Sequence, residues 1–417
     1  MMISKRTFLK TLALAAGLPF TGNGKEWANW LATQPESNDF WLQIRNDYEL
    51  KSDYINLENG YYSMMAKPVM EAYLNDIRYI NREHSYYMRT VQFENKYNTR
   101  NRLAQLLGCS NEELIITRNT TESLDTVING IDWKPGDEAI AAWQDYGSML
   151  DMFRQQERRY GIKLNIVSVP NHPQNDEEIV SLYEKAITPK TKLIMICHII
   201  NITGQILPVK KICDMAHAHG VEVMVDGAHA VAHIQFNLKE LGCDYYGSSL
   251  HKWLGAPLGA GILYVNKDSI EKLWPLFGES AFASNDIRKL NHTGTIPVAT
   301  DLAINHAIDY HLKIGIERKE ARLKFLKNYW TEKVMKKKNV VLNTPSSPER
   351  TGAIANVGVK NIPPSQLAKT LLNKYKIWTV AIENEKAGVQ GVRITPHLYT
   401  TTEELDKLVE AIVELGA

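Results

Sequence analysis

The chain has 417 residues, of which 44% are hydrophobic and 23% charged, a composition typical of a globular protein with a large buried core. Its 48 basic and 47 acidic side chains leave a net charge of +1, which gives no electrostatic reason to expect a nucleic acid or an acidic membrane surface as a partner. The four cysteines lack metal-ligand or CxxC spacing and no apolar run reaches membrane-spanning length, so we expect neither a metal site nor a membrane span.

The N-terminus has the pattern of an export signal. A basic segment at residues 4–10 (SKRTFLK) precedes an apolar stretch at residues 11–18. Its letters resemble the twin-arginine signal S-R-R-x-F-L-K, which exports folded proteins, although Lys5 stands where the first arginine belongs. We predict that residues 1–39 are signal and linker and that the protein is periplasmic. The alternative is an amphipathic N-terminal helix on a cytoplasmic protein.

From residue 114 onwards, short apolar runs alternate with helical patterns. Strands are predicted at 114–117, 139–142, 164–169, 193–197 and 222–225, and helices at about 120–131, 148–160, 177–186 and 209–216. This alternation predicts an α/β fold with a mostly parallel sheet covered by helices on both faces. Two further strand-like runs, 244–246 and 261–265, follow with little helix between them, which allows one edge of the sheet to run antiparallel.

The pattern changes after about residue 303. One long charged helix is predicted over 303–335, followed by short strands and a final helix over 402–415. We therefore predict a large domain over 40–303, whose N-terminal segment touches the small domain, and a small α+β domain over 304–417. Ligands of open α/β sheets bind at the carboxyl ends of the strands, so polar clusters that follow strands are the candidates for a site.

The first such cluster is residues 117–122 (TRNTTE). Asn119 is a candidate N-cap and Glu122 can complete a capping box, which leaves the amides of Thr120 and Thr121 free. A helix N-terminus of this kind binds phosphate well. The alternative is a plain helix cap.

The second and third clusters contain Asp226 and Lys252. Asp226 ends an apolar strand and precedes Gly-Ala, so it can pair with a pyridinium nitrogen or cap a turn. Lys252 lies in SSLHKWLG, residues 248–255, beside Ser249 and His251, which are candidate phosphate ligands. An apolar pocket favours the neutral amine that forms imines, whereas the alternative is an exposed loop lysine.

The fourth cluster is residues 391–397 (GVRITPH). Arg393 lies between apolar neighbours, where a buried guanidinium needs an anion, and its fork of N–H groups matches a carboxylate. That anion is either the substrate carboxylate or the partner in a structural ion pair.

The order of these clusters resembles the class V aminotransferase family of fold-type I pyridoxal-phosphate (PLP) enzymes, especially its isopenicillin N epimerase-like branch, from about residue 56 to the C-terminus. The resemblance implies that PLP is the cofactor, that Lys252 is catalytic and carries it as a Schiff base, and that the enzyme is a homodimer. It also implies that Asp226 pairs with the pyridine nitrogen and His229 approaches the ring hydroxyl. The other implied roles are phosphate binding by Thr120, Thr121, Ser249 and His251, a place near the ring hydroxyl and substrate for Asn201, stacking on the ring by Tyr146 (or Trp143 or Asp145), a phosphate contact from the partner subunit by Thr295, and substrate carboxylate binding by Arg393.

The family includes cysteine desulfurases, whose catalytic cysteine lies shortly before the carboxylate-binding arginine. Residues 377–392 contain no cysteine, which argues against a desulfurase that forms a persulfide. We predict an enzyme that acts at Cα of an amino acid, or of an amino-acid moiety in a larger metabolite, as an aminotransferase or epimerase. The alternatives are a C–S lyase acting on a cysteine derivative and a non-catalytic PLP-binding scaffold.

Overall fold

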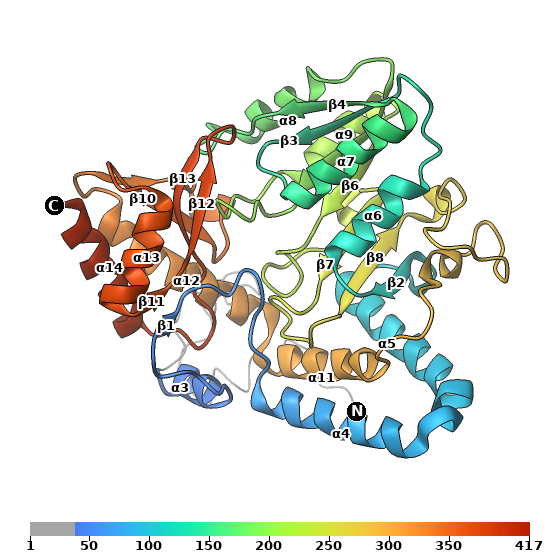
Figure 1. Cartoon of the computed structure of the whole chain (residues 1–417), viewed down its shortest axis with the longest axis horizontal. Helices are drawn as coiled ribbons and strands as arrows, with labels where there is room; N and C mark the ends of the chain where they lie inside the picture. Colours follow the sequence, from blue (N-terminus) through green and yellow to red (C-terminus); the bar gives the residue numbers. More distant parts are fainter. Residues whose placement is uncertain (1–37) are drawn as a thin grey trace, which may run out of the picture.

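The computed structural model describes residues 38–417, so the predicted export signal lies outside the described residues. The chain folds around a seven-stranded sheet, and its C-terminal third adds a smaller four-stranded sheet beside it (Figure 1). No helix among the described residues combines the length and apolar character needed to cross a membrane.

The large sheet has the strand order β2-β8-β7-β6-β5-β3-β4. Its strands are β2 (Leu114–Thr117), β3 (Glu138–Ala142), β4 (Lys163–Val167), β5 (Thr191–Cys197), β6 (Glu222–Asp226), β7 (Tyr245–Ser249) and β8 (Gly261–Val265). The five strands from β7 to β4 run parallel, as predicted, whereas β8 is antiparallel to both β7 and β2. The reversed strand is therefore second from the edge rather than at the edge itself.

Helices cover both faces of this sheet, which explains the continuous apolar runs. They are α6 (Thr120–Gly130), α7 (Gly147–Tyr160), α8 (Asp176–Glu184), α9 (Val209–Ala218) and the short α10 (Leu238–Leu241). Alternate residues of β5 enter two different cores, since Ile194 and Ile196 belong to one buried cluster and Leu193 and Met195 to the other.

The segment before β2 contains elements that were not predicted from the sequence. They are α3 (Asn38–Asn46), β1 (Ile55–Asn56), α4 (Lys67–Tyr86), a π-helical turn (Tyr87–Val91) and α5 (Gln92–Leu107). Helix α4 packs along α11 (Ala299–Ile314), below the sheet in Figure 1. Short 3₁₀ turns lie at Asn111–Glu113, Lys267–Ser269, Ile287–Asn291 and Pro348–Arg350.

The small sheet has the order β12-β13-β10-β9 and is antiparallel throughout. This part of the chain comprises α12 (Ile316–Val334), β9 (Val340–Leu342), β10 (Ala355–Val359), α13 (Pro364–Tyr375), β11 (Ile377–Trp378), β12 (Val380–Asn384), β13 (Val389–Ile394) and α14 (Thr402–Gly416). Strand β1 pairs in parallel with β11, so the N-terminal segment joins the small domain.

The prediction of one long helix over 303–335 is wrong. The chain forms α11 and α12 instead, separated at Gly315, which has a φ of 88°. Glycine adopts this left-handed region without the steric cost that a side chain would bring, so it ends α11 and allows α12 to start in a new direction.

Candidate active site

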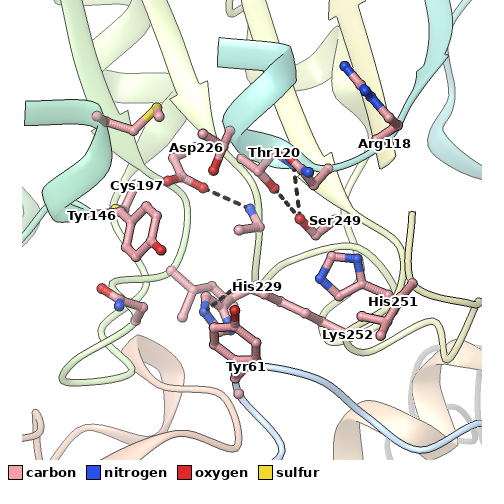
Figure 2. A pocket seen from close by; sticks show the side chains of 18 of the residues that line it. Tyr61, Arg118, Thr120, Tyr146, Cys197, Asp226, His229, Ser249, His251 and Lys252 are labelled. Carbon is pink, nitrogen blue, oxygen red and sulfur yellow. Dashed lines mark hydrogen bonds between the residues drawn. The ribbon is translucent and has the colours of Figure 1, made fainter. Parts of the chain in front are cut away.

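A cavity of about 310 Å³ lies where the carboxyl ends of β5, β6 and β7 face the N-terminus of α6 (Figure 2). Ten of the predicted site residues line it: Thr120, Thr121, Tyr146, Asn201, Asp226, His229, Ser249, His251, Lys252 and Arg393. Apart from Arg393, which comes from the small sheet, the strands of the large sheet bring these residues together because the carboxyl ends of its parallel strands meet at one edge.

The partly buried Lys252 lies just after β7, and its amine faces the cavity. Burial lowers the pKa of Lys252 to about 8, against the opposing effect of the Asp226 carboxylate. Its Nζ lies 3.3 Å from Nε2 of His229 (Figure 2). About a tenth of an amine with this pKa is neutral at pH 7, far more than for an ordinary lysine, and the neutral form is the nucleophile that forms an imine.

Asp226 is the last residue of β6 and is 5% exposed. One carboxylate oxygen accepts the backbone N–H of Ala228 at 3.0 Å, and turns rather than a helix occupy residues 228–233. Burial raises the pKa of Asp226, while the Ala228 N–H and the charge of Lys252 lower it. A buried carboxylate held in this way suits a cationic partner such as a protonated pyridine nitrogen.

His229 is held in one tautomer by Trp253. The indole Nε1–H can only donate, and it lies 3.3 Å from Nδ1 of His229, so Nδ1 is the acceptor. Burial, followed by the charge of Lys252, holds the pKa of His229 far below its usual range, so the ring is neutral. The proton is therefore on Nε2, and His229 presents a hydrogen-bond donor to the cavity.

The N-terminus of α6 forms the polar end of the cavity. Asn119 caps the helix by accepting the N–H of Glu122 at 2.9 Å, but the predicted capping box does not form. The Glu122 carboxylate instead accepts the N–H of Arg118 at 2.6 Å and pairs with its guanidinium. Thr120 donates its N–H to the Ser249 hydroxyl at 3.0 Å, so two hydroxyls and a helix N-terminus converge there, as binding of a phosphate requires.

Arg393 on β13 reaches the cavity from the small domain, and it is paired with an acidic residue that the sequence did not identify. Its Nη2 lies 2.5 Å from Oε1 of Glu58 and its Nε 3.2 Å from Oε2. The side chains are 8% and 7% exposed, respectively. The sequence analysis left open whether the anion beside Arg393 is a substrate carboxylate or the partner in a structural ion pair. The structure allows both, because Arg393 lines the cavity and is also paired with Glu58.

The remaining predicted residues separate into two groups. Tyr146 lines the cavity, whereas Trp143 and Asp145, the alternatives for a stacking residue, do not belong to its lining. Thr295 is exposed and lies in a second cavity, formed by α5 and residues 279–301, so it does not reach the site within one chain.

The cavity also contains residues that sequence reasoning missed, namely Tyr61, Cys197 and Leu258. Glu58, Asn59 and Tyr61 form a polar cluster after the short strand β1, so the criterion applied to the other strand ends would have found them only if β1 had been predicted. Cys197 donates to Asp145 at 3.2 Å, and burial raises the pKa of its thiol, which makes it unreactive.

The residues present fit PLP. Two buried polar atoms of the lining, Oδ1 of Asn201 and Nδ1 of His251, have no hydrogen-bond partner within residues 38–417 and are available to a polar ligand. The lining further supplies an amine, a buried carboxylate and a helix N-terminus, which match the aldehyde, the ring nitrogen and the phosphate of PLP. The described residues contain no cluster of His, Cys, Asp and Glu suited to a metal ion.

Comparison with known proteins agrees with this chemistry. The family model of aminotransferase class V matches residues 59–408. The isopenicillin N epimerase of Streptomyces clavuligerus is 27% identical over 392 residues, which cover 89% of this chain and 97% of the epimerase. The cysteine desulfurase of Haloferax volcanii is 27% identical over 332 residues, covering 75% of this chain and 76% of the desulfurase.

Solved structures show the same fold. A lysine-to-alanine variant of C-DES, with glycine covalently linked to its PLP cofactor, superimposes with a TM-score of 0.81 at 19% identity, over 91% of this chain and all of the other. The chain belongs to the class V aminotransferase family, and it is a PLP-dependent enzyme of fold type I.

Proposed function

We propose that this enzyme inverts the configuration at Cα of an amino-acid moiety carried by a larger metabolite. The observation that carries the proposal is the meeting of three groups in one open cavity: the Lys252 amine, the buried Asp226 carboxylate and the Arg393 guanidinium. The likeness to isopenicillin N epimerase over nearly the whole of both chains supports the choice of reaction.

The chain's own residues each have a defined task. Arg393 binds the α-carboxylate and so orients the Cα–H bond, and the Lys252 amine takes up the Cα proton from one face, so that inversion follows when a proton is delivered to the opposite face. Asp226 keeps the ring nitrogen protonated, and His229 donates its Nε2–H toward the ring hydroxyl. PLP, when bound, supplies the electron sink that makes the Cα proton acidic.

The rim of the cavity supports a substrate larger than a free amino acid. Tyr61, Leu258 and Tyr146 line the cavity and are 75%, 60% and 44% exposed, respectively. Such side chains at an entrance offer apolar contact to a part of the ligand that extends beyond the site.

The reaction can be assigned by incubating the holoenzyme with amino acids and short peptides in D₂O. Epimerisation gives deuterium at Cα together with the inverted stereoisomer on chiral chromatography. A keto acid as the product would instead show a transaminase, and pyruvate with sulfide from a cysteine derivative would show a C–S lyase. Either result would refute the proposed reaction, and a protein that binds PLP but exchanges no Cα proton of any of these compounds would be a non-catalytic scaffold.

We also propose that the enzyme works as a homodimer in which Thr295 contacts the phosphate bound in the partner subunit. In support, Thr295 is exposed beside Phe93 and Tyr97, whose side chains are 66% and 55% exposed. Thr295→Ala should weaken PLP binding without changing the sedimentation coefficient. A fully active monomer in sedimentation velocity would refute this assembly.

Export is a separate proposal, which rests on the basic and apolar segments at residues 4–18. A fusion of residues 1–39 to a reporter that is active only after export in the folded state should reach the periplasm, and Lys5→Arg should export equally well or better. Retention of the reporter in the cytoplasm of a host with a working twin-arginine pathway would refute it.

A further inference from the structure

The Arg393 guanidinium is held on several sides before any substrate binds. Glu58 accepts hydrogen bonds from Nε and Nη2, and the backbone carbonyl of Asn201 accepts one from Nη1 at 3.3 Å. Gly60 packs against the same group, because a Cβ on this glycine would lie only 3.0 Å from Cζ of Arg393. Three of the five N–H donors are thus engaged, and one donor remains on each terminal nitrogen.

Glu58 is itself fixed in place. Its Oε1 also accepts the backbone N–H of Tyr61 at 2.9 Å, and its own N–H donates to the side chain of Asn56 at 3.0 Å. The next residue, Asn59, bonds twice to Thr395 on the strand end that carries Arg393, at 2.6 and 2.7 Å. Glu58 therefore cannot swing away without breaking contacts to the backbone around it.

We infer that Glu58 is a positioning residue: it holds the Arg393 guanidinium in an orientation in which the guanidinium can bind one further carboxylate. Its side-on pair occupies the Nε–Nη2 edge and leaves the remaining donors of the terminal nitrogens for the α-carboxylate of the substrate. This inference rests on the proposed function, because it takes the substrate to be an amino acid or a molecule that ends in one. It adds a residue that determines specificity for the carboxylate.

Glu58→Gln tests this role because an amide is a poor substitute here. Its oxygen can accept one guanidinium N–H, but its NH₂ group can only donate and so faces the second N–H donor-to-donor. The guanidinium then loses one charge-assisted bond and its fixed orientation. Glu58→Asp keeps the charge but withdraws it by one methylene, and it serves as the conservative variant if Glu58→Gln does not fold.

The assay is titration of each holoenzyme with glycine and, separately, with ethylamine, following the absorbance of the bound cofactor. Glycine carries the α-carboxylate, whereas ethylamine has an amine without one. Glu58→Gln should weaken glycine binding by about ten- to a hundredfold, the value of one charge-assisted hydrogen bond, and leave ethylamine binding unchanged. Glu58→Asp should give a smaller loss with glycine alone.

The chain offers a matched control in Glu404, which forms a two-pronged ion pair with Arg45 at 2.8 and 3.1 Å, outside the lining of the cavity. Glu404→Gln should lower the melting temperature but keep the wild-type ratio of glycine to ethylamine affinity. An unchanged ratio in Glu58→Gln would make Glu58 purely structural, and tighter glycine binding would make it a competitor of the substrate. Both results overturn the inference. A wild-type enzyme that shows no preference for glycine over ethylamine would refute the carboxylate site itself, and with it the proposed function.

Discussion

Lys319 on α12 is a buried lysine bonded to the backbone next to Lys252, and its replacement by methionine gives the sharpest test of how burial changes stability in this protein. The side chain is 3% exposed, and its amine donates to the backbone carbonyl of Trp253, the residue that follows Lys252. Burial lowers the pKa of Lys319 to about 7. A lysine in the unfolded chain has a pKa of about 10.4, so the unfolded state binds more protons between these two values.

The sign and size of the effect follow from this difference. Stability rises with pH between about 7 and 10.4, because the folded state has already lost the proton that the unfolded state still holds. Below pH 7 the buried charge lowers the free energy of unfolding by about 4–5 kcal/mol, because the two pKa values differ by about 3.4 units and each unit corresponds to 1.36 kcal/mol. Lys319→Met removes this cost but leaves the Trp253 carbonyl without its donor, which costs about 1–3 kcal/mol. We therefore expect the variant to be more stable by about 2 kcal/mol at pH 6.5 and less stable than the wild type at pH 10.

Urea unfolding of both proteins at pH 6.5, 8 and 10 measures this difference. Comparing the two proteins isolates Lys319, since Lys252 and Lys327, whose pKa values burial also lowers to about 8, are present in both. A variant that is less stable than the wild type at pH 6.5, or a difference that does not change with pH, would show that a partner compensates the Lys319 charge and would refute the reasoning.

Four further outcomes are expected. Borohydride reduction of the holoenzyme should fix the pyridoxyl group on the peptide that contains Lys252, and Lys252→Ala should abolish turnover; an adduct on another lysine would displace it from this role. Asp226→Asn should fold normally, because an amide oxygen can still accept the Ala228 N–H. It should lose activity by about a hundredfold or more, which corresponds to the free energy of a charged hydrogen bond. Turnover near that of the wild type would remove Asp226 from the mechanism. Arg393→Lys should lower glycine affinity by about thirtyfold and should also lower the melting temperature. Lysine keeps the charge but lacks the forked N–H donors that bind both the substrate carboxylate and Glu58. Normal kinetics with lower stability would assign the residue to the fold. Burial lowers the pKa values of His198 and His233 to about 3, so the unfolded chain binds more protons than the folded protein between pH 6.5 and 3. The free energy of unfolding should therefore fall progressively as the pH is lowered from 6.5 toward 3. Urea midpoints that stay constant between pH 7 and 5 would contradict this.

The sheet could be predicted from the sequence because most of its strands are buried on both faces. Most of them appear as apolar runs between turn residues, and the predicted strand at 114–117 has the bounds of β2. Helix α4 gave no such signal, since Val69 is the only fully buried residue among its twenty. The glycine that divides α11 from α12 was missed for a different reason, because a lone glycine also occurs within continuous helices.

Most of the residues that line the cavity could be predicted because their polar clusters lie at or just after the ends of strands, so that local sequence carries the chemistry. The exception is the anion that pairs with Arg393. Glu58 is 335 residues away in the sequence, and the pairing of β1 with β11 together with the bridge from Glu58 to Thr395 brings it to β13. A pattern near Arg393 shows that an anion is needed but contains nothing that identifies its source.

Residues 58–63 connect Arg393 of the small domain to the backbone beside Lys252. Glu58 binds Arg393 of the small domain, Asn59 binds Thr395, and four residues later the N–H of Ser63 donates to the carbonyl of His251 at 3.1 Å. His251 precedes Lys252, so one short stretch of backbone connects Arg393, for which we propose carboxylate binding, to Lys252, for which we propose proton transfer. The distance between these two groups is therefore fixed by hydrogen bonds along this segment as well as by packing between the domains. Because a misplacement of about 1 Å is enough to slow a reaction a hundredfold, a change in this segment should impair catalysis even where it leaves both domains folded.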